Sequence, residues 1–420
     1  MHPSSAAEQW MDWLATVAMA HGLHLSVVGG AVRDRLLGKS TPDKDLDLVV
    51  EGVCSWPAIQ LLELINTQAL PPGFQLKQSQ SFEAFGTAQL HLQTPAGRLL
   101  CDLSSARSER YTFPGAHPEV QPTDLVGDLR RRDFSINAIA ERLPLGSSPL
   151  LDPFDGTGDL KAGQLKLLHP LSLEDDPSRL LRGVRYGARL RLELAPETTA
   201  QMQSTLDDWP WPDDAPALAS RSRMELELLF AESCWRSALQ CLETWRGLEL
   251  IQRGWKALPP RSPAWLQRLG QWGHAIDPNW SAEELKLVGL LWLVPHQNNL
   301  LAIAKRLQLA HRQQQLLSRG LELQTWLQGL NPESTHAWKP SNWTNALEER
   351  GAKTEPAMVL MLLGPNHQPY RRPLLRWLLR WRLIQSPLSA KELMNQGLSA
   401  GPELGSRLKE LRVEAINQNA

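Results

Sequence analysis

Two aspartates separated by a single residue are the first pair in this sequence suited to chemistry. Asp45 and Asp47 lie in a run that alternates acidic and apolar residues, as a half-buried strand does. Side chains at positions i and i+2 of a strand share one face, so we expect the two carboxylates to point the same way. Paired carboxylates repel each other in water but suit divalent metal ions such as Mg²⁺. Taken alone, the pair is also typical of a solvated strand end.

A Gly-Gly turn precedes the aspartates. An apolar run, residues 23–28, ends in Gly29 and Gly30, and residues 31–37 then have helical character. A strand that runs through two glycines into a helix makes a cradle for phosphate, because the backbone approaches closely and the helix start presents free N–H groups. Asp45 follows Gly30 by fifteen residues. This order predicts a triphosphate and metal ions side by side.

An arginine-rich segment supplies donors for phosphates. Three consecutive arginines, residues 130–132, precede a segment predicted to be an apolar helix. Arginine at a helix start opposes the helix dipole, which makes a phosphate partner a better explanation than a solvated helix start. Asp133 and Asn137 stand four residues apart on the predicted helix and are candidates for contacts to a ribose or a sugar phosphate.

A later segment combines acids with planar cations. Pro177 follows two acids and marks the start of a predicted helix, on which arginines recur at positions 179, 182, 185 and 189 along one broad face. Asp176 and Arg179 offer an acceptor and a donor fork side by side, and such a pair can read the edge of a nucleobase. The alternative is a charged surface face, although such a face usually mixes signs.

In this order the segments resemble the class II tRNA nucleotidyltransferase and bacterial poly(A) polymerase family. The matching stretches are GGAVRDRLLG (29–38), DKDLDLVVEG (43–52), RRDFSINAIA (131–140), DPFDGTGDL (152–160) and DDPSRLLRGVRYGARL (175–190). Residues 102–111 resemble the strand and loop before the arginine motif, and the resemblance covers roughly the first 190 residues. A later family motif is met loosely by residues 220–228, where Arg223, Glu227 and Leu228 match.

The resemblance implies an α+β fold, with a small polymerase-β-like nucleotidyltransferase head, built from a mixed sheet with helices, followed by an all-α neck, body and tail. We expect the head over residues 1–145, the neck with the nucleobase-template motif over 146–230, the body over 231–330 and a tRNA-binding tail over 331–420. The composition changes accordingly, since 14 of the 17 tryptophans follow residue 208. We expect these rings mostly in the core of a helical array.

The resemblance also implies the reaction and the residues that perform it. The RNA 3′-hydroxyl would attack the α-phosphorus of CTP or ATP in line and release pyrophosphate, in a two-metal Mg²⁺ mechanism. Asp45 and Asp47 would bind the metals, and Asp102 is either a third ligand or a buried or capping aspartate. The nucleotide-binding positions would be Gly29, Gly30 and Arg33 for the triphosphate, Arg132, Asp133 and Asn137 for ribose and phosphates, and Asp176 and Arg179 for the base. Arg182 would steady either this base-reading template or the triphosphate.

Several functions within the family stay open, namely addition of CCA, of CC, of the terminal A or of a poly(A) tail. Residues 107–128 supply a loop between the aspartate pair and the arginine motif, which members that add only CC tend to lack. The loop therefore favours an enzyme able to add A. A net charge of −1 argues against a poly(A) polymerase and against a globally basic RNA coat. A catalytically inactive RNA-binding protein is the alternative from another class.

The helical half contains one strongly basic segment. Arg372, Arg376 and Arg380 recur at i,i+4 spacing and are candidates for contacts to tRNA phosphates. Trp377 and Trp381 share another face, so the alternative is a tryptophan face in the core with arginine stems lying over it.

The remaining features indicate the setting in which the protein works. The sequence shows no secretory signal and no stretch apolar enough to span a membrane. Its four cysteines have neither paired nor zinc-binding spacing. We therefore expect a reduced, cytoplasmic protein. The resemblance implies tRNA and nucleoside triphosphates as its partners, and we expect a monomer or weak homodimer.

Overall fold

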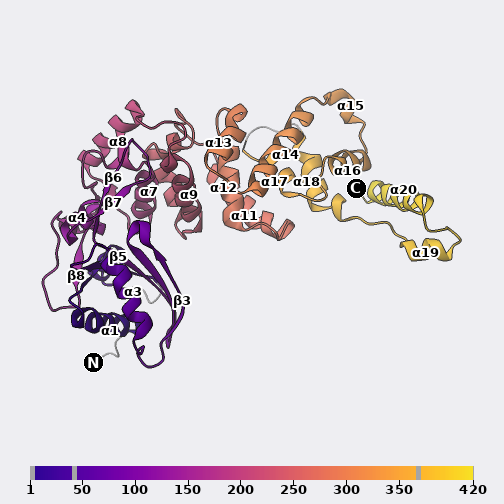
Figure 1. Cartoon of the computed structure of the whole chain (residues 1–420). Helices are drawn as coiled ribbons and strands as arrows, with labels where there is room; N and C mark the ends of the chain where they lie inside the picture. Colours follow the sequence, from indigo (N-terminus) through magenta and orange to yellow (C-terminus); the bar gives the residue numbers. More distant parts are fainter. Residues whose placement is uncertain (1–4, 40–44, 366–369, 420) are drawn as a thin grey trace. The chain divides into compact units, whose positions relative to one another are not determined.

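A computed structural model describes residues 5–39, 45–365 and 370–419 (Figure 1). The first two residues of the stretch 43–52 lie outside the described residues. The chain divides into two compact units, Met1–Ser222 and Arg223–Ala420. Strands occur in the first unit, and the described residues of the second form helices and loops. The predicted α+β fold class is therefore confirmed, while the finer division into head, neck, body and tail stays a prediction. Within the described ranges, no helix combines the length and the apolar character needed to cross a membrane.

A mixed six-stranded sheet forms the centre of the first unit, with the strand order β3-β4-β5-β2-β1-β8. β2 and β5 run parallel, and the other neighbouring pairs are antiparallel. The strands are β1 (His24–Val28), β2 (Asp45–Glu51), β3 (Gln75–Phe82), β4 (Thr87–Thr94), β5 (Gly97–Ser105) and β8 (Ala140–Arg142). The long polar strand β3 is an addition to the predicted elements.

One face of this sheet is covered by two helices and forms the main hydrophobic core (Figure 1). The helices are α1 (Ala6–Ala20) and α3 (Pro57–Thr67). Their apolar side chains pack against the sheet in one cluster with Leu46 and Leu48. Because side chains alternate along a strand, Asp45 and Asp47 must point to the opposite face. A one-residue slip would bury both carboxylates in this core, so the core itself fixes where they emerge.

The segments that follow the sheet strands carry most of the remaining site residues. They are α2 (Gly30–Leu36), β6 (Arg107–Arg110), β7 (Glu119–Pro122), α4 (Leu125–Arg130), the 3₁₀ turn η2 (Ser135–Asn137), α5 (Gly156–Ala162), β9 (Gln164–Leu165), α6 (Ser172–Asp175), α7 (Ser178–Leu190), β10 (Glu193–Leu194), α8 (Pro196–Asp208) and α9 (Ser220–Ala231). The short 3₁₀ turns η1 (Glu83–Phe85) and η3 (Pro216–Leu218) complete the first unit.

Two local predictions in this region are wrong. The expected loop over residues 107–128 contains a two-stranded ribbon, in which β6 pairs with β7, and then α4. The three arginines do not precede a helix but follow one: Asp124 caps the start of α4 by accepting from the Gly127 N–H, and Arg130 is its last residue. A single 3₁₀ turn comes next, so Asp133 and Asn137 are not on a shared α-helix. The dipole argument for a phosphate partner therefore fails, and the case for one depends on the geometry of the site.

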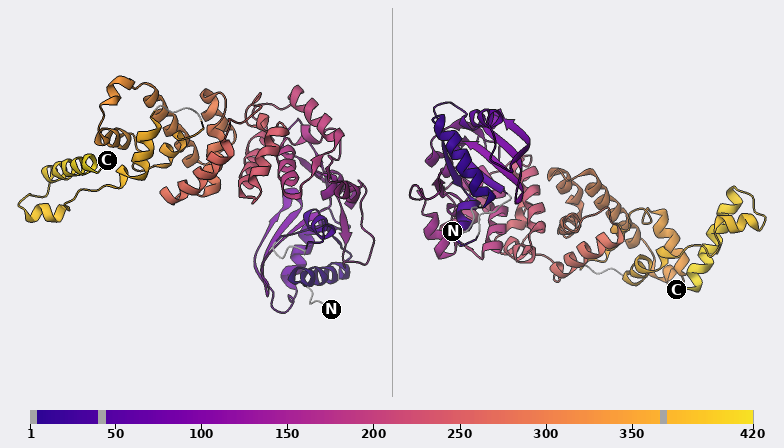
Figure 2. Two further views of the ribbon diagram at one scale, coloured as in Figure 1. Left: turned by 180° about the vertical axis from the view of Figure 1, so that it is seen from behind. Right: turned by 90° about the horizontal axis from the view of Figure 1, so that it is seen from below.

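The second unit packs its helices around buried tryptophans. These helices are α10 (Trp235–Thr244), α11 (Ser262–Ile276), α12 (Ala282–Trp292), α13 (Leu300–Arg306), α14 (His311–Gln328), α15 (Pro332–His336), α16 (Pro340–Glu349), α17 (Ala357–Leu362), α18 (Arg371–Leu379), α19 (Ala390–Asn395) and α20 (Pro402–Gln418), with 3₁₀ turns η4 (Gly247–Leu250), η5 (Gln297–Asn299) and η6 (Trp381–Leu383) (Figure 2). Its buried tryptophans are Trp235, Trp255, Trp265, Trp280, Trp292, Trp343, Trp377 and Trp381. The expectation of a mostly structural role for them is confirmed.

Candidate active site

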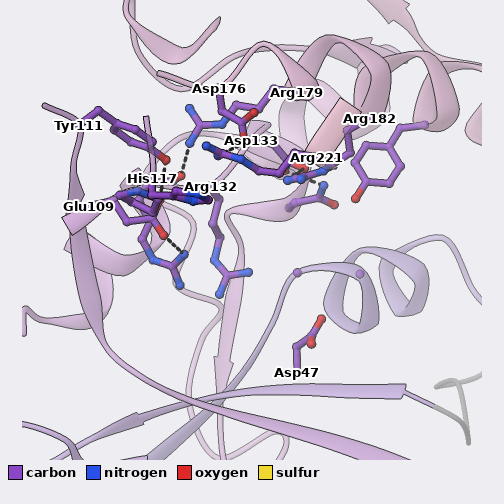
Figure 3. Close-up of a pocket in the computed structure, with 16 residues that line it drawn as sticks. Asp47, Glu109, Tyr111, His117, Arg132, Asp133, Asp176, Arg179, Arg182 and Arg221 are labelled. Carbon is purple, nitrogen blue, oxygen red and sulfur yellow. Dashed lines mark hydrogen bonds and ion pairs between the residues drawn. The ribbon is translucent and has the colours of Figure 1, made fainter. Parts of the chain in front are cut away.

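A cavity of about 470 Å³ lies in the first unit at the polar face of its sheet (Figure 3). This volume falls within the range of about 300–1,000 Å³ that is usual for small-molecule sites. The lining comes from β2, the Gly-Gly turn, the β6–β7 ribbon, the segment after α4, α7 with Asp176 shortly before it, and the start of α9. Most positions expected to bind a nucleotide or metal line it together: Gly29, Gly30, Asp47, Arg132, Asp133, Asn137, Asp176, Arg179 and Arg182. Asp45, Asp102 and Arg33 are not among the lining residues.

The Gly-Gly turn brings a carboxylate and a guanidinium next to the backbone. Gly29 has φ +70°, a left-handed conformation that favours glycine. A methyl group added there would lie 3.3 Å from Arg132 Nη1 and 3.9 Å from Asp47 Oδ2. An anion beside this turn would therefore meet the arginine, and a metal ion bound to the carboxylate would lie next to it. This is the arrangement that a triphosphate with its metal requires.

Replacing Gly29 tests this close approach. We expect Gly29→Ala to lower the free energy of unfolding by about 1–2 kcal/mol through backbone strain and to raise the KM for the nucleotide, because the methyl group displaces Arg132. Gly22→Ala is the matched control, since Gly22 has the same φ of +70° but nothing within 4 Å of an added methyl group. Urea denaturation and nucleotide titration separate the two effects. An equal KM change in both variants would contradict the assignment.

The carboxylates of β2 and β5 form the candidate metal site. Asp47 pairs in register with Asp102 across the parallel strands β2 and β5. The surrounding protein displaces water from Asp47, and this desolvation is the main cause that raises the pKa of its carboxyl. Asp102 and Asp45 raise it further, while Arg132 lowers it. Asp102 accepts a hydrogen bond from Gln89 Nε2 at 2.9 Å.

This donor set fits Mg²⁺. Its members are carboxylate oxygens, and their mutual repulsion is what a bound cation would relieve. In the described parts of the chain, no three His, Cys, Asp or Glu side chains are gathered closely enough to hold an ion together. Mg²⁺ commonly takes one or two carboxylates and completes its shell with water and substrate phosphates, so a pair is sufficient. The role of Asp102 as a third ligand stays a prediction.

Along the cavity wall, a chain of hydrogen bonds and an ion pair connects α2, η2 and α7. Arg33 donates to Asn137 Oδ1 at 2.6 Å, and Asn137 donates to Asp133 Oδ1 at 3.0 Å. Arg182 Nη1 lies 3.4 Å from the other oxygen of Asp133. Burial alone would raise the pKa of Asp133, but Arg182 and hydrogen bonds from Asn137 and the Phe134 N–H hold it below its ordinary value. Arg33 is buried in this chain, so the structure places it as a support for Asn137, and its contact with a triphosphate stays a prediction.

A buried aspartate clamps two of the cavity arginines. Asp128 is fully buried. Its Oδ1 accepts from Arg131 Nε and Nη2 at 3.0 and 2.8 Å, and its Oδ2 accepts from Arg132 Nη2 at 3.0 Å. Burial alone would raise its pKa, but Arg132 and Arg131 outweigh this and lower it. The clamp orients both guanidinium groups toward the cavity. Sequence reasoning missed Asp128, although its spacing of three and four residues from the arginines was a usable signal.

Removing the clamp is expected to loosen both arginines. Asp128→Asn loses charge-assisted hydrogen bonds worth about 2 kcal/mol, and the KM for the nucleotide should rise about tenfold or more as the arginines lose their orientation. Because the folded pKa is lowered, the stabilising contribution of Asp128 is present above the ordinary aspartate pKa of about 4 and is lost as pH falls below it.

Denaturation at several pH values and nucleotide titration measure these effects. The stability gap between the wild type and Asp128→Asn should narrow below about pH 4. The control Asp124→Ala removes the cap of the same helix α4, should cost about 1 kcal/mol, and should leave the KM for the nucleotide unchanged. A normal KM in Asp128→Asn would show that the clamp does not serve the site.

The far end of the cavity holds the proposed base-reading pair. Asp176 accepts from the N–H and hydroxyl of Ser178 through Oδ1 and from Arg221 Nη1 at 2.9 Å through Oδ2. Arg179 is buried and donates to the hydroxyl and carbonyl of Ser172 through Nη1 and to the Arg131 carbonyl through Nη2. Both groups are thus held in fixed orientations at the cavity wall (Figure 3). Asp175, the other acid of the motif, does not line the cavity.

Arg221 is a lining residue that sequence reasoning missed. It contacts Asp176 and also donates to the Ala116 carbonyl at 2.6 Å, which ties the base-reading acid to the segment between β6 and β7. The stretch 220–228 signalled this part of the chain, but the residue singled out there was Arg223, which instead pairs with Glu227 on its own helix at 2.7 Å. Glu109, Tyr111 and His117 of the ribbon region also line the cavity.

The basic segment of the second unit differs in part from its prediction. Arg372 and Arg376 are exposed on α18, and Trp377 and Trp381 are buried. Arg380 is exposed too, but α18 ends at Leu379 and Arg380 has φ −135° and ψ −63°. The predicted single face of three arginines on one helix is therefore wrong for Arg380. A tRNA contact by these arginines stays a prediction.

The sheet, the Gly-Gly turn with its carboxylates and the arginine-lined cavity together have the features expected of a site for a nucleotide and its metal ions. Residues 25–166 match the family described as "Poly A polymerase head domain". The A-adding tRNA nucleotidyltransferase of Aquifex aeolicus is 30% identical over 412 residues, which are 94% of this chain and 45% of that protein. The CC-adding tRNA nucleotidyltransferase of Deinococcus radiodurans is 41% identical over 236 residues, 56% of this chain and 57% of that one.

Solved structures of CCA-adding enzymes share the fold along almost the whole chain. The match to one apo form has a TM-score of 0.73 at 21% identity, and it covers 99% of this chain and 93% of the apo-form chain. Complexes with CTP and with ATP have TM-scores of 0.69 and 0.68. These findings support the class II tRNA nucleotidyltransferase and bacterial poly(A) polymerase family for this chain. It spans about half the length of the curated relatives it matches.

Proposed function

We propose that the chain adds CMP, AMP or both, from CTP and ATP, to the 3′ end of tRNA. One observation carries the proposal: a single cavity joins a carboxylate beside a Gly-Gly turn, Asp47 at Gly29, to a fixed acceptor and donor pair, Asp176 and Arg179. The first set suits a triphosphate and the second suits a base. The relatives named as A-adding and CC-adding tRNA enzymes, and the same fold in complexes with CTP and ATP, support this choice of substrates.

The chemistry divides between the two aspartates and the arginines. Mg²⁺ held by Asp45 and Asp47 would supply activation of the RNA hydroxyl and neutralisation of the leaving group. Arg132, oriented by Asp128, offers charge to the phosphates near Gly29. Asp133 and Asn137, which Arg182 and Arg33 hold in position, would contact the ribose.

The base-reading pair accounts for a preference for C and A. Cytosine and adenine both present an exocyclic amino donor, whereas uracil and guanine present a carbonyl at the same position. A carboxylate oxygen of Asp176 can accept from an amino group but is repelled by a carbonyl. Arg179 can donate to the neighbouring ring nitrogen. Arg221 and Ser172 hold the two groups in place, so the protein takes the part of a template strand.

The products of extension separate the possible activities. The protein is incubated with Mg²⁺, one labelled nucleoside triphosphate at a time, and tRNA transcripts that end before CCA, after one C or after CC. Extension of all three transcripts indicates CCA addition. Extension of only the first two, with CTP, indicates CC addition. Extension of only the last, with ATP, indicates addition of the terminal A. A long A ladder would show a poly(A) polymerase. Absence of extension with retained tRNA binding would favour the inactive alternative.

The proposal also covers the domain division, the tRNA contacts of the second unit, the oligomeric state and the cellular compartment. We infer a head, neck, body and tail along the predicted boundaries, with tRNA contacts by Arg372, Arg376 and Arg380, and a monomer or weak homodimer. The cytoplasm is the proposed compartment because tRNA and nucleoside triphosphates occur there, and the four cysteines are free thiols.

A further inference from the structure

A second cavity in the first unit opens at the other aspartate of β2. Its volume is about 960 Å³, and its lining comes from β3, β4 and β5 together with Asp45. The lining residues of the two cavities do not overlap. The two aspartates of one strand thus face different spaces: Asp47 faces the nucleotide cavity, and Asp45 faces this larger one.

The strand register shows how this second cavity is built. Asp45 stands opposite Leu100 of β5, Leu100 opposite His91 of β4, and His91 opposite Gln78 of β3. All four lie on the sheet face away from the core that α1 and α3 cover, and all four line the cavity. The row therefore forms a platform that runs from a candidate metal ligand across three further strands.

A row of hydrogen-bonded side chains connects this platform to the candidate metal site. His91 Nε2 lies 3.1 Å from Gln89 Oε1, and Gln89 Nε2 donates to Asp102 Oδ1 at 2.9 Å. Asp102 in turn is the register partner of Asp47. Hydrogen-bonded side chains thus connect the platform to the candidate metal-binding carboxylates.

The lining of this cavity contains two positive charges. Lys77 and Arg98 are exposed and line the cavity, whose lining contains Asp45 as its acid. The hydrogen-bond partner of Lys77 is the neutral Gln75, at 2.8 Å. A cavity whose lining combines two exposed cations with a candidate metal-binding carboxylate suits a polyanion whose reacting end reaches the carboxylate.

We propose that this second cavity binds the 3′-terminal nucleotides of the acceptor RNA, with Lys77 and Arg98 on its backbone phosphates. The inference rests on the proposed function and names the site of its second substrate. In-line transfer needs the attacking oxygen and the leaving group on opposite sides of the reacting phosphorus. Two cavities that each contain one aspartate of β2 suit this requirement: the nucleoside triphosphate would occupy one, and the hydroxyl would enter from the other.

Charge removal with a salt titration tests this site. The double variant Lys77→Gln/Arg98→Gln should raise the KM for tRNA about tenfold or more at moderate salt while the KM for the nucleotide stays within about twofold. The slope of log KM for tRNA against the logarithm of the salt concentration should fall by about 1.4. Each single-strand phosphate contact contributes about 0.7 to this slope, and the double variant removes two such contacts. A merely structural change would not alter this slope.

Lys161→Gln is the matched control, since Lys161 is an exposed lysine on α5 that lines neither cavity. It should change neither the KM for tRNA nor the salt slope. If the double variant behaves like this control while the wild type extends tRNA, the inference is overturned and the proposed function stands. If the wild type extends no RNA at all, the proposed function itself fails.

A cross-linking experiment on the unmodified protein decides the matter without variants. A tRNA whose last nucleotide carries 4-thiouracil is irradiated in the complex, and the labelled peptides are identified. We expect cross-links in peptides from β3 to β5, residues 75–105. Cross-links confined to other peptides would place the RNA end elsewhere and overturn the inference.

Discussion

Asp45→Asn and Asp47→Asn should each lower nucleotide incorporation at least about 1,000-fold while the protein stays folded. Removal of one metal-binding carboxylate costs several kcal/mol of transition-state stabilisation, and about 1.4 kcal/mol corresponds to a factor of ten in rate. Both side chains project from β2 on the face opposite the core, so an isosteric amide disturbs no packing.

The stability of Asp47→Asn provides a second readout. Desolvation and the neighbouring carboxylates raise the pKa of Asp47, so its ionised form destabilises the fold at neutral pH. The amide should therefore keep or increase the free energy of unfolding while activity is lost. Asp12→Asn on the exposed side of α1 is the control and should keep full activity. Near-normal turnover in either β2 variant would remove the metal assignment.

Arg179→Ala should reduce the preference for CTP and ATP over UTP and GTP. A bidentate contact to a base contributes about 1–3 kcal/mol of discrimination, which corresponds to roughly 5- to 150-fold in the ratio of kcat/KM values. Arg179→Lys keeps the charge but loses the planar fork, so it should lose most of the same discrimination.

The control for this series is Arg185→Ala, on the same helix α7 but outside the cavity lining. It should retain the wild-type ratio of kcat/KM values. Should Arg179→Ala also retain that ratio, with only its overall rate reduced, the arginine would be a structural support rather than part of the template.

Sequence patterns predicted those elements whose residues differ clearly between core and solvent. The alternation around Asp45 gave the correct strand and face, because burial of Leu46 and Leu48 requires it. β3 lacked any such contrast, since nearly all its side chains are polar and exposed. Its place is fixed by pairing with β4, which a local pattern cannot reveal.

The site was predictable where its residues are close in sequence, but contacts between distant segments were not. Arg221 contacts Asp176 although the two are 45 residues apart in sequence. From the sequence alone, Arg223 was an equally suitable candidate for this part of the site. Arg33 matched a motif for phosphate binding, yet its guanidinium donates a hydrogen bond to Asn137, which is 104 residues further along the chain. Such contacts depend on how helices pack, which spacing alone does not specify.

The most direct test of the central claim is a comparison of all four nucleoside triphosphates on tRNA that lacks its CCA end. The kcat/KM for each triphosphate is measured at saturating tRNA with Mg²⁺ present, and the four values are compared. The proposed cavity, with Asp176 and Arg179 as its base-reading end, predicts efficient use of CTP, ATP or both, and poor use of UTP and GTP. Comparable use of all four, or no incorporation of any, would contradict it.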